Sequence, residues 1–334
     1  MHQNKNQNTN QQHEPVLLNE VLQILEPQPG DTYLDLTAGY GGHALAILER
    51  TGSLTPAVLI DRDPRAITAL KQKFAGKHIS IRQLDFLSAA RELLQDARQF
   101  DLILADLGVS SPLFNDASRG FAISKDGPLD MRMDPAQGLT AATIVNSYSQ
   151  PDLIKMLKNY GEEPKAKQIA EMIVANRPIN STVKLAEIVA RAWPGRSRLH
   201  PATRTFQALR IAVNDELHLL EQSLPLWLKL LTPGGRIAII SFHSLEDRLV
   251  KNALQSAAGD RYDAELRLLT KRPITSSKPE TVFNPRARSA KLRAAVKIKK
   301  KGNAYADSGK KQLPSLQDSR QSGLNRQVAV LAPE

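Results

Sequence analysis

Residues 32–61 read TYLDLTAGYGGHALAILERTGSLTPAVLID, and this stretch predicts a strand, a glycine-rich turn, a helix and a second strand. We expect the strands at 32–36 and 57–61 and the helix at 44–50, because short apolar runs flank the glycines. Glycine has no Cβ, so the turn lets the backbone approach a ligand, and the following helix begins with free N–H groups. The second strand ends in Asp61, which is placed to hold the two hydroxyls of a ribose. The stretch therefore predicts a site for a nucleoside cofactor.

Two kinds of cofactor fit this turn. The pattern Gly39-x-Gly41-x-x-Ala44 satisfies the dinucleotide fingerprint, whose third position accepts alanine. Asp35 favours S-adenosylmethionine, because a carboxylate that faces the loop would repel a pyrophosphate and attract the ammonium and sulfonium groups. The turn alone leaves both open, so a nucleotide-dependent oxidoreductase stays an alternative to a methyltransferase.

Strands and helices alternate after Asp61, as they do in proteins with a parallel, doubly wound sheet. The expected elements are helices at 64–74 and 87–97 and strands at 78–82 and 100–106. The next buried strand is expected only at 235–241, after turn residues at 232–235. The connection between these last two strands is far longer than a normal crossover, which predicts an inserted unit.

The long connection is predicted to be helical. Apolar residues recur at helical spacing in three segments, 152–159, 165–176 and 182–192. We therefore expect an α/β protein in which a small helical domain, 113–210, is inserted into a Rossmann-like sheet domain, 13–112 and 211–300. A long helix near 203–231 is expected to lead back to the fifth strand.

Positive charge is concentrated near the C-terminus. The chain carries a net charge of +11, and residues 270–311 hold 13 lysines or arginines against two acids, so the rest of the chain is neutral overall. Concentrated basic charge gives sequence-independent affinity for nucleic acid, which predicts a phosphate-binding arm. A solvated tail is the alternative for 297–311. Residues 286–293 alternate basic and apolar side chains and are expected to be folded.

The amino-acid composition excludes several classes of protein. The chain has no cysteine, which excludes disulfides and thiolate chemistry and fits a reducing compartment. It has no apolar run long enough for a membrane span and no signal peptide pattern, so neither feature is expected. Residues 1–12, rich in Asn and Gln, are expected to be disordered, and residues 301–334 form a low-complexity basic tail.

Polar side chains follow the expected strands. The residues at these ends are Asp35, Asp61, Asp85 and Asp106 after the first four strands and Ser241 at the end of the fifth. In open α/β sheets, ligands bind beyond the carboxyl ends of the strands. We therefore expect acids around a cationic ligand that carries a nucleoside. Phe86 is placed to pack against an adenine, with a role in the core as the alternative.

The loop after the fourth strand, residues 106–112, is the expected place of the methyl acceptor. An exocyclic amine is a poor nucleophile because its lone pair is delocalised into the ring. Catalysis then needs placement in line with the methyl-sulfonium and acceptors for the amine protons. Asp106 and Ser110 are the candidates for orienting the amine, and a turn or helix cap is the alternative for Ser110.

Three more segments carry expectations. Residues 120–134 form a long polar loop, which predicts a lid or a binding loop, and their acids do not follow calcium-loop spacing, so no metal is expected. Arg204 is a candidate phosphate contact, with structural pairing as the alternative. Residues 244–247 look like a capping box, and His243 before them is expected to be structural.

Seven segments together resemble one family. They are residues 35–43, 104–111, 127–133, 160–163, 200–206, 240–248 and 284–288. The residues of these segments, and their order along the chain, are similar to those of the bacterial ribosomal RNA small subunit methyltransferase H family. The similarity runs from about His13 to Lys297. The resemblance implies S-adenosylmethionine-dependent N4-methylation of a cytidine in the decoding region of 16S ribosomal RNA, in the cytoplasm. It also implies a helical insert beside a Rossmann-like sheet.

The resemblance also implies roles for single residues. The implied donor contacts are Gly41, Gly42 and His43 around the methyl donor, Asp61 at the ribose, and Phe86 and Asp106 at the adenine and methionine ends. The implied partner is 16S ribosomal RNA or the small subunit, gripped by the insert and the basic C-terminal region. Leu113 stands where the family usually has a polar residue, and Ala44 where serine is common. A non-catalytic RNA-binding assembly factor stays a further alternative.

Overall fold

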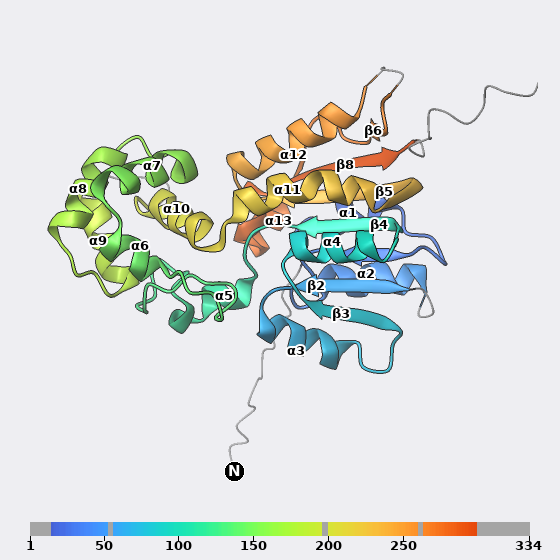
Figure 1. Ribbon diagram of the computed structural model, residues 1–334, viewed down its shortest axis with the longest axis horizontal. Coiled ribbons are helices and arrows are strands. Elements are labelled where there is room, and N and C mark those ends of the chain that lie inside the picture. The colour runs from blue at the N-terminus through green and yellow to red at the C-terminus, as the bar shows by residue number, and fades with distance from the viewer. Residues whose placement is uncertain (1–14, 53–55, 196–199, 260–262, 299–334) are drawn as a thin grey trace, which may run out of the picture. The chain divides into compact units, whose positions relative to one another are not determined.

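The computed structural model describes residues 15–52, 56–195, 200–259 and 263–298, and all of them belong to one compact unit. The predictions for residues 1–12 and 301–334 lie outside the described residues. The unit is built on an eight-stranded sheet of order β3-β2-β1-β4-β5-β8-β6, with β7 paired to β8 (Figure 1). Strands β1 to β5 are parallel, and β6, β7 and β8 form antiparallel pairs.

The parallel part of the sheet agrees with the sequence prediction. Its elements are β1 (Tyr33–Asp35), α2 (Gly42–Thr51), β2 (Ala57–Asp61), α3 (Pro64–Lys73), β3 (Ile79–Gln83), α4 (Phe86–Gln95), β4 (Phe100–Asp106) and β5 (Leu231–Ser241). Only β5 begins clearly earlier than predicted. The expected turn at 232–235 is a bulge within this strand, because Phe100 pairs with Leu231 and Leu102 with Arg236.

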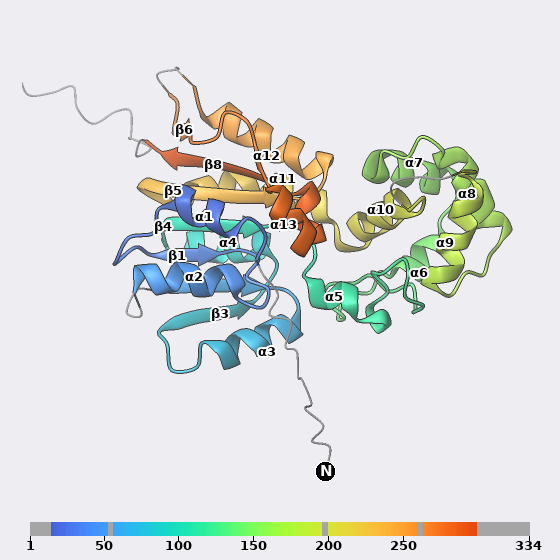
Figure 2. The same cartoon turned by 180° about the vertical axis from the view of Figure 1, so that it is seen from behind.

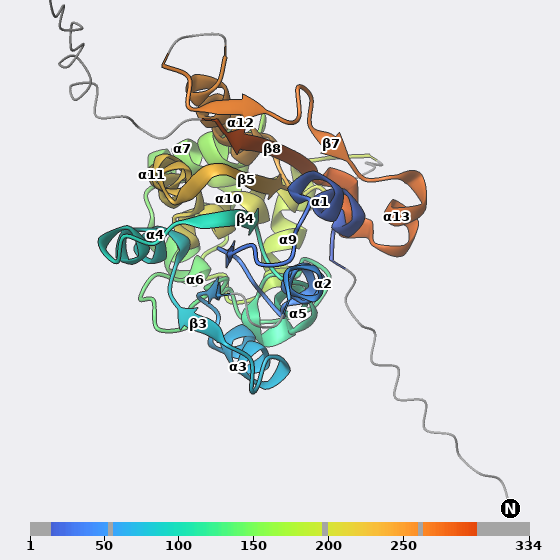
Figure 3. The ribbon, with the colours of Figure 1, turned by 90° about the vertical axis from the view of Figure 1, so that its right-hand side faces the viewer.

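Helices cover both faces of the sheet (Figure 3). One layer consists of α4, α11 (Glu216–Lys229) and α12 (Ser244–Ala257), which bury Leu93, Trp227 and Leu254 against the strands. The other consists of α1 (Leu18–Leu25), α2 and α3, which bury side chains such as Val21 and Ile47. Strands covered on both faces read as continuous apolar runs, which explains why they were predictable.

The basic C-terminal region takes part in the sheet. Its elements are β6 (Leu266–Leu268), β7 (Ile274–Thr275), α13 (Lys278–Phe283), the 3-10 helix η2 (Pro285–Ser289) and β8 (Lys291–Lys297). Arg293 Nε donates to Asp247 at 2.6 Å, and Lys297 Nζ donates to the carbonyls of Leu228 and Leu231 at 2.8 and 3.0 Å. The expectation that this part is folded is confirmed. A phosphate-binding role is wrong for Arg293 and Lys297, because both are buried and paired.

The long connection between β4 and β5 is helical. It contains α5 (Ser111–Asn115), the 3-10 helix η1 (Ala117–Arg119), α6 (Ala141–Ser147), α7 (Gln150–Gly161), α8 (Ala166–Ala175), α9 (Thr182–Arg191) and α10 (Thr203–Asn214). Helices α6 to α10 share one apolar cluster that includes Ile144, Leu157 and Ile173 (Figure 2). The predicted single helix at 203–231 is wrong, because Asp215 adopts φ 50° between α10 and α11. The domain boundaries at 113 and 210 stay our proposal.

The segment 120–134 has no regular structure, as expected, but it is packed. Phe121, Leu129 and Met131 are buried in the apolar cluster of the helical segment. Arg119 Nη2 donates to the carbonyls of Arg132 and Met133 at 2.8 and 3.0 Å. Residues 120–134 are therefore fixed against the helical segment and do not form an open lid.

Gly120 is required at the start of segment 120–134. We expect Gly120→Ala to lower the free energy of unfolding by at least about 2 kcal/mol. Its φ is +71°, and an added Cβ would lie 2.1 Å from the carbonyl oxygen of Pro128. Gly138→Ala is the matched control, because a Cβ there meets open space. Denaturant unfolding of the two variants checks this, and equal midpoints would contradict it.

Candidate functional site

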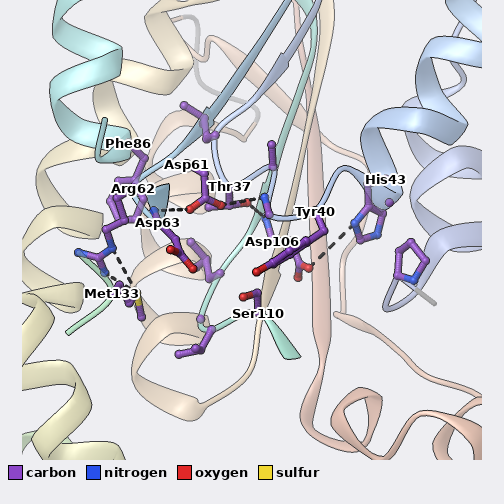
Figure 4. A pocket seen from close by; sticks show the side chains of 18 of the residues that line it. Thr37, Tyr40, His43, Asp61, Arg62, Asp63, Phe86, Asp106, Ser110 and Met133 are labelled. Carbon is purple, nitrogen blue, oxygen red and sulfur yellow. Dashed lines mark hydrogen bonds and ion pairs between the residues drawn. The ribbon is translucent and has the colours of Figure 1, made fainter. Parts of the chain in front are cut away.

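A cavity of about 770 Å³ opens at the carboxyl ends of the parallel strands. Its walls include the turn after β1, the first turn of α2, the end of β2 and the loop after β4 (Figure 4). Ligand sites in proteins commonly have volumes of about 300–1,000 Å³. The cavity therefore has the size and the position expected for a nucleoside cofactor.

The glycine turn serves the cavity in two ways. Gly42 and His43 line the cavity, at the start of α2. Gly41 is absent from the lining, although it was expected to contact the ligand. It has φ 73°, and a Cβ there would lie 2.8 Å from the ring of Phe74 and 2.9 Å from Leu70. Gly41 thus allows α2 to begin close to α3, and its direct contact with the methyl donor stays a prediction.

Asp61 is held by two backbone amides. Gly39 N–H donates to Oδ2 and Asp63 N–H donates to Oδ1, each at 2.8 Å. Burial raises the pKa of Asp61, and the two hydrogen bonds oppose this shift. Each oxygen still has acceptor capacity beyond its backbone partner. A carboxylate fixed in this way suits the two hydroxyls of a ribose.

Asp35 points away from the cavity. It is 2% exposed, it accepts a hydrogen bond from the Tyr33 hydroxyl at 2.7 Å, and it does not line the cavity. Burial raises its pKa to about 6. Asp35 therefore does not meet a ligand directly, and the prediction that its charge attracts a cationic donor stays a prediction. Ser241 is also buried outside the lining, whereas Asp85 lines the cavity and caps α4.

Asp106 presents a partly buried carboxyl to the cavity, with its side chain 25% exposed. Its Oδ1 is buried without a hydrogen-bond partner among the described residues, and its Oδ2 lies 4.0 Å from His43 Nδ1. Burial raises the pKa of Asp106 to about 7, Arg286 opposes the shift and Glu246 adds to it. An unpartnered carboxyl oxygen is costly in an interior, so this position is suited to a ligand that supplies the missing donor.

The hydroxyl of Ser110 is a second polar group at the cavity that lacks a hydrogen-bond partner among the described residues. It occupies the N-cap position of α5, but its side chain makes no cap hydrogen bond, so the capping alternative is wrong. Within the described part of the chain its Oγ is buried and has no partner. Ser110 and Asp106 both line the cavity (Figure 4). Two acceptors are thus available to one ligand group.

His43 is fixed in one tautomer. Its Nε2 lies 3.0 Å from the carbonyl oxygen of Val16, which accepts only, so Nε2 carries the proton and Nδ1 offers a lone pair towards Asp106. Burial lowers the pKa of His43, which keeps the ring neutral. Phe86 lines the cavity and packs edge-on against Trp227, with ring centroids 5.4 Å apart. Its alternative role in the core is confirmed, and its packing against an adenine stays a prediction.

The two departures from the family pattern have different positions. Leu113 lines the cavity and is 4% exposed, so an apolar side chain replaces a polar one in the wall. Ala44 is fully buried in α2 and does not line the cavity. Only the change at Leu113 alters the surface that a ligand meets.

Sequence reasoning missed two arginines in the wall. Arg62 Nη2 lies 2.8 Å from Met133 Sδ, and Nη1 donates to the carbonyl of Asn214 at 3.2 Å. Arg286 donates to the carbonyl of Val109, and its guanidinium lies 5.7 Å from the centroid of the Phe242 ring. Their partners are distant in sequence, so no local pattern marks them.

Three possible metal ligands meet beside the cavity: Glu216, His243 and Glu246. Arg210 donates to both oxygens of Glu216 at 2.9 and 2.8 Å. His243 Nδ1 accepts the N–H of Glu246 at 3.4 Å, which leaves the proton on Nε2, the nitrogen 3.2 Å from the Glu246 carboxylate. Nε2 then has no free lone pair for a metal, and the set suits a hydrogen-bonded network beside the Arg210–Glu216 ion pair. A capping box is present one residue earlier than predicted, because His243 rather than Ser244 is the cap residue and Glu246 its partner. The structural role expected for His243 is confirmed.

Arg204 has a structural partner, since its Nη1 donates to the carbonyl of Glu162 at 3.2 Å. The side chain of Glu162 in turn accepts from Arg248 Nη2 at 3.1 Å. The structural alternative for Arg204 therefore holds, and the residue lies on the surface of α10.

The sequence of the chain is similar to those of known methyltransferases. The sequence model of the MraW methylase family matches residues 10–298. A relative from Heliobacterium mobile, named Ribosomal RNA small subunit methyltransferase H, is 45% identical and covers 86% of this chain and 99% of its own. A relative of the same name from Nitratidesulfovibrio vulgaris is 47% identical over 86% and 95%.

A solved structure of a putative rRNA-methylase from Clostridium thermocellum matches with a TM-score of 0.43 and 11% identity, over 86% of this chain and 99% of its own. None of the helices in the described part of the chain has the length and apolar content that a bilayer crossing requires.

Proposed function

Because the chain belongs to the MraW methylase family, we propose that it transfers a methyl group from S-adenosylmethionine to N4 of a cytidine in the decoding region of 16S ribosomal RNA. The chain is a methyltransferase, and the resemblance inferred from its motifs is confirmed. The observation that carries the proposal is the pair of unpartnered buried oxygens of Asp106 and Ser110 in one cavity with the fixed carboxylate of Asp61. The reaction takes place in the cytoplasm.

The donor fits the residues that line the cavity. Asp61 accepts hydrogen bonds from the ribose hydroxyls, and Phe86 packs against the adenine. The methionine end lies near Gly42, His43 and Asp106, where a positive sulfonium is attracted by the carboxylate. This attraction also favours the ionised form of Asp106 and lowers its pKa from the value of about 7 in the free protein.

The residues of the loop after β4 act on the acceptor. The donor supplies an already activated methyl group, so the protein has to place the amine in line with it. Asp106 and Ser110 accept hydrogen bonds from the two N4 protons and turn the amine towards the methyl group. After transfer, the extra proton on N4 leaves to the Asp106 carboxylate or to water. Asp106 thus chiefly orients the amine.

The RNA has to present one base to this buried position. A cytidine in a stack cannot reach the loop after β4, so the target base leaves its stack and enters the cavity. The helical segment and the exposed part of the basic C-terminal region hold the RNA backbone around it. The substrate is 16S ribosomal RNA or the assembled small subunit.

The direct test uses labelled methyl donor and unmodified small ribosomal subunits, followed by mapping of the modified nucleoside. Label on N4 of a decoding-region cytidine is the expected result. Label on a ring carbon or on a ribose oxygen contradicts the proposal. The oxidoreductase alternative now rests only on the Gly-x-Gly-x-x-Ala pattern, and binding of NADH by calorimetry would be needed to support it.

A further inference from the structure

The short helix α13 has an unusual surface. It contains no buried residue, and its last two residues are the most exposed large apolar side chains in the described part of the chain: Val282 is 74% and Phe283 83% exposed. Single exposed apolar residues are normal, but an adjacent pair at the end of a helix with nothing packed on it marks a contact surface.

The helix is held firmly in place at both ends. Ser277 caps its first turn, and Glu280 Oε1 accepts the N–H of Leu17 at 2.7 Å, which ties α13 to the start of α1 (Figure 3). Ser276, just before the helix, donates its Oγ–H to the carbonyl of Ala287, just after it, at 2.7 Å, and Ala287 is fully buried. Phe283 is thus presented by a fixed element, and its exposure does not come from a loose chain end.

The helix lies at the edge of the cavity. Pro15 and Leu18, on either side of Leu17, line the cavity, and so does Arg286, three residues after Phe283. The two segments that flank α13 therefore both belong to the cavity wall. A molecule that enters the cavity with one part can reach α13 with another.

The charge around the apolar pair is positive. Lys278 and Arg288 are exposed on the same segment, and Arg286 is half-buried beside it. The single acid of the segment, Glu280, is engaged by the backbone of Leu17. An exposed aromatic ring between cations is the arrangement that binds single-stranded nucleic acid, because the ring stacks on a base while the cations meet phosphates.

We infer that Phe283, with Arg288 and Lys278, forms a docking surface for single-stranded RNA, on which a base next to the target cytidine stacks while the target enters the cavity. This inference rests on the proposed function. Phosphates complement the surrounding cations, whereas a second copy of this chain would bring the same positive charge to the contact, which is unfavourable.

The test compares Phe283→Ala, Phe283→Leu and Phe283→Trp in the full chain. Affinity for unmodified small subunits and for S-adenosylmethionine is measured separately, the latter by calorimetry. Loss of one stacked base weakens RNA binding about tenfold. We expect this loss in the alanine and leucine variants, since leucine has no π-face, and near-normal affinity in the tryptophan variant. Donor affinity is expected to stay unchanged in all three.

Ile298→Ala is the matched control, because Ile298 is 46% exposed and follows the end of β8 at which Val296 pairs with Arg236. The other end of β8 pairs with Ser241 at the carboxyl end of β5, the side on which the cavity opens. It is expected to bind subunits like the wild type. Arg288→Ala is expected to reduce the slope of log affinity against log salt by about 0.7, the value for one phosphate contact on a single strand.

Three results would overturn the inference. Wild-type affinity in Phe283→Ala means that nothing stacks there. Wild-type affinity in Phe283→Leu together with a loss in Phe283→Ala indicates an apolar protein contact. A change of oligomeric state in Phe283→Ala, with RNA affinity intact, indicates a second copy. If the wild type binds subunits but methylates no N4, the proposed reaction fails while the binding comparison still decides the role of Phe283.

Discussion

Asp106→Asn is expected to lower kcat for methyl transfer about a hundredfold or more, the usual size of an effect when a positioned acid–base group is lost. Asparagine keeps the shape of the side chain, but one end becomes an NH₂ donor that faces the amine protons and repels them. Single-turnover kinetics with saturating donor and subunits measure this rate. Ser110→Ala removes a neutral acceptor and is expected to have a smaller effect. Equal rates for Asp106→Asn and the wild type would refute the role of the carboxylate.

The pH dependence gives an independent check. Burial raises the pKa of Asp106 to about 7 in the free protein, so below this pH the carboxyl is protonated and cannot accept an amine proton. The wild-type rate should rise with pH and level off at or below about 7, since a bound sulfonium shifts the inflection downwards. Asp106→Asn should lose this inflection.

The stability of the folded protein changes with pH in the opposite direction to the methyl-transfer rate. The pKa of Asp106 is higher in the folded than in the unfolded protein, where it is about 4. The contribution of this group to stability is therefore complete below pH 4 and is lost as the pH rises towards 7. Asp35, with a pKa of about 6, adds to the same trend. Thermal unfolding at pH 8 should show Asp106→Asn at least as stable as the wild type, so a loss of activity cannot be ascribed to unfolding.

Asp61→Ala is expected to weaken S-adenosylmethionine binding about a hundredfold or more. Two hydrogen bonds to a charged acceptor contribute about 1.5–3 kcal/mol each, and 1.4 kcal/mol corresponds to tenfold in affinity. The variant also leaves the N–H groups of Gly39 and Asp63 without their acceptor. Calorimetry with S-adenosylmethionine measures the loss, and Asp61→Asn should give an intermediate value.

Asp96→Ala is the control for the loss of one negative charge, since Asp96 is an exposed acid at the end of α4. Unchanged donor affinity in Asp61→Ala would remove the ribose assignment. The same variant separates catalysis from assembly, because a non-catalytic assembly factor should keep its assembly activity in Asp61→Ala, whereas methyl transfer should collapse.

The sequence could predict the parallel strands and the polar residues at their ends. Strands β2 and β4 are apolar runs that end in Asp61 and Asp106, and parallel order places these ends at one edge of the sheet. The sequence does not predict the direction in which a side chain at such an end points. Asp35 follows the same pattern but turns towards the hydroxyl of Tyr33, because a buried partner was within reach.

What could not be predicted depends on contacts between distant segments. The basic residues of β8 read as a nucleic-acid arm, and only the position of Asp247 on α12 reveals that Arg293 is already paired. Arg62 belongs to the cavity because Met133 and Asn214 approach it from the helical segment. The break between α10 and α11 falls at Asp215, a residue that no glycine or proline announces.

Strand β8, the last in the described part of the chain, lies between β5 and β6 rather than at an edge. A growing polypeptide on the ribosome that has reached α13 therefore still lacks the strand that joins β6 to β5, and Arg286 has not yet met Val109. The wall of the donor cavity therefore stays incomplete until the segment that carries Arg286 has been synthesised and has packed against the sheet.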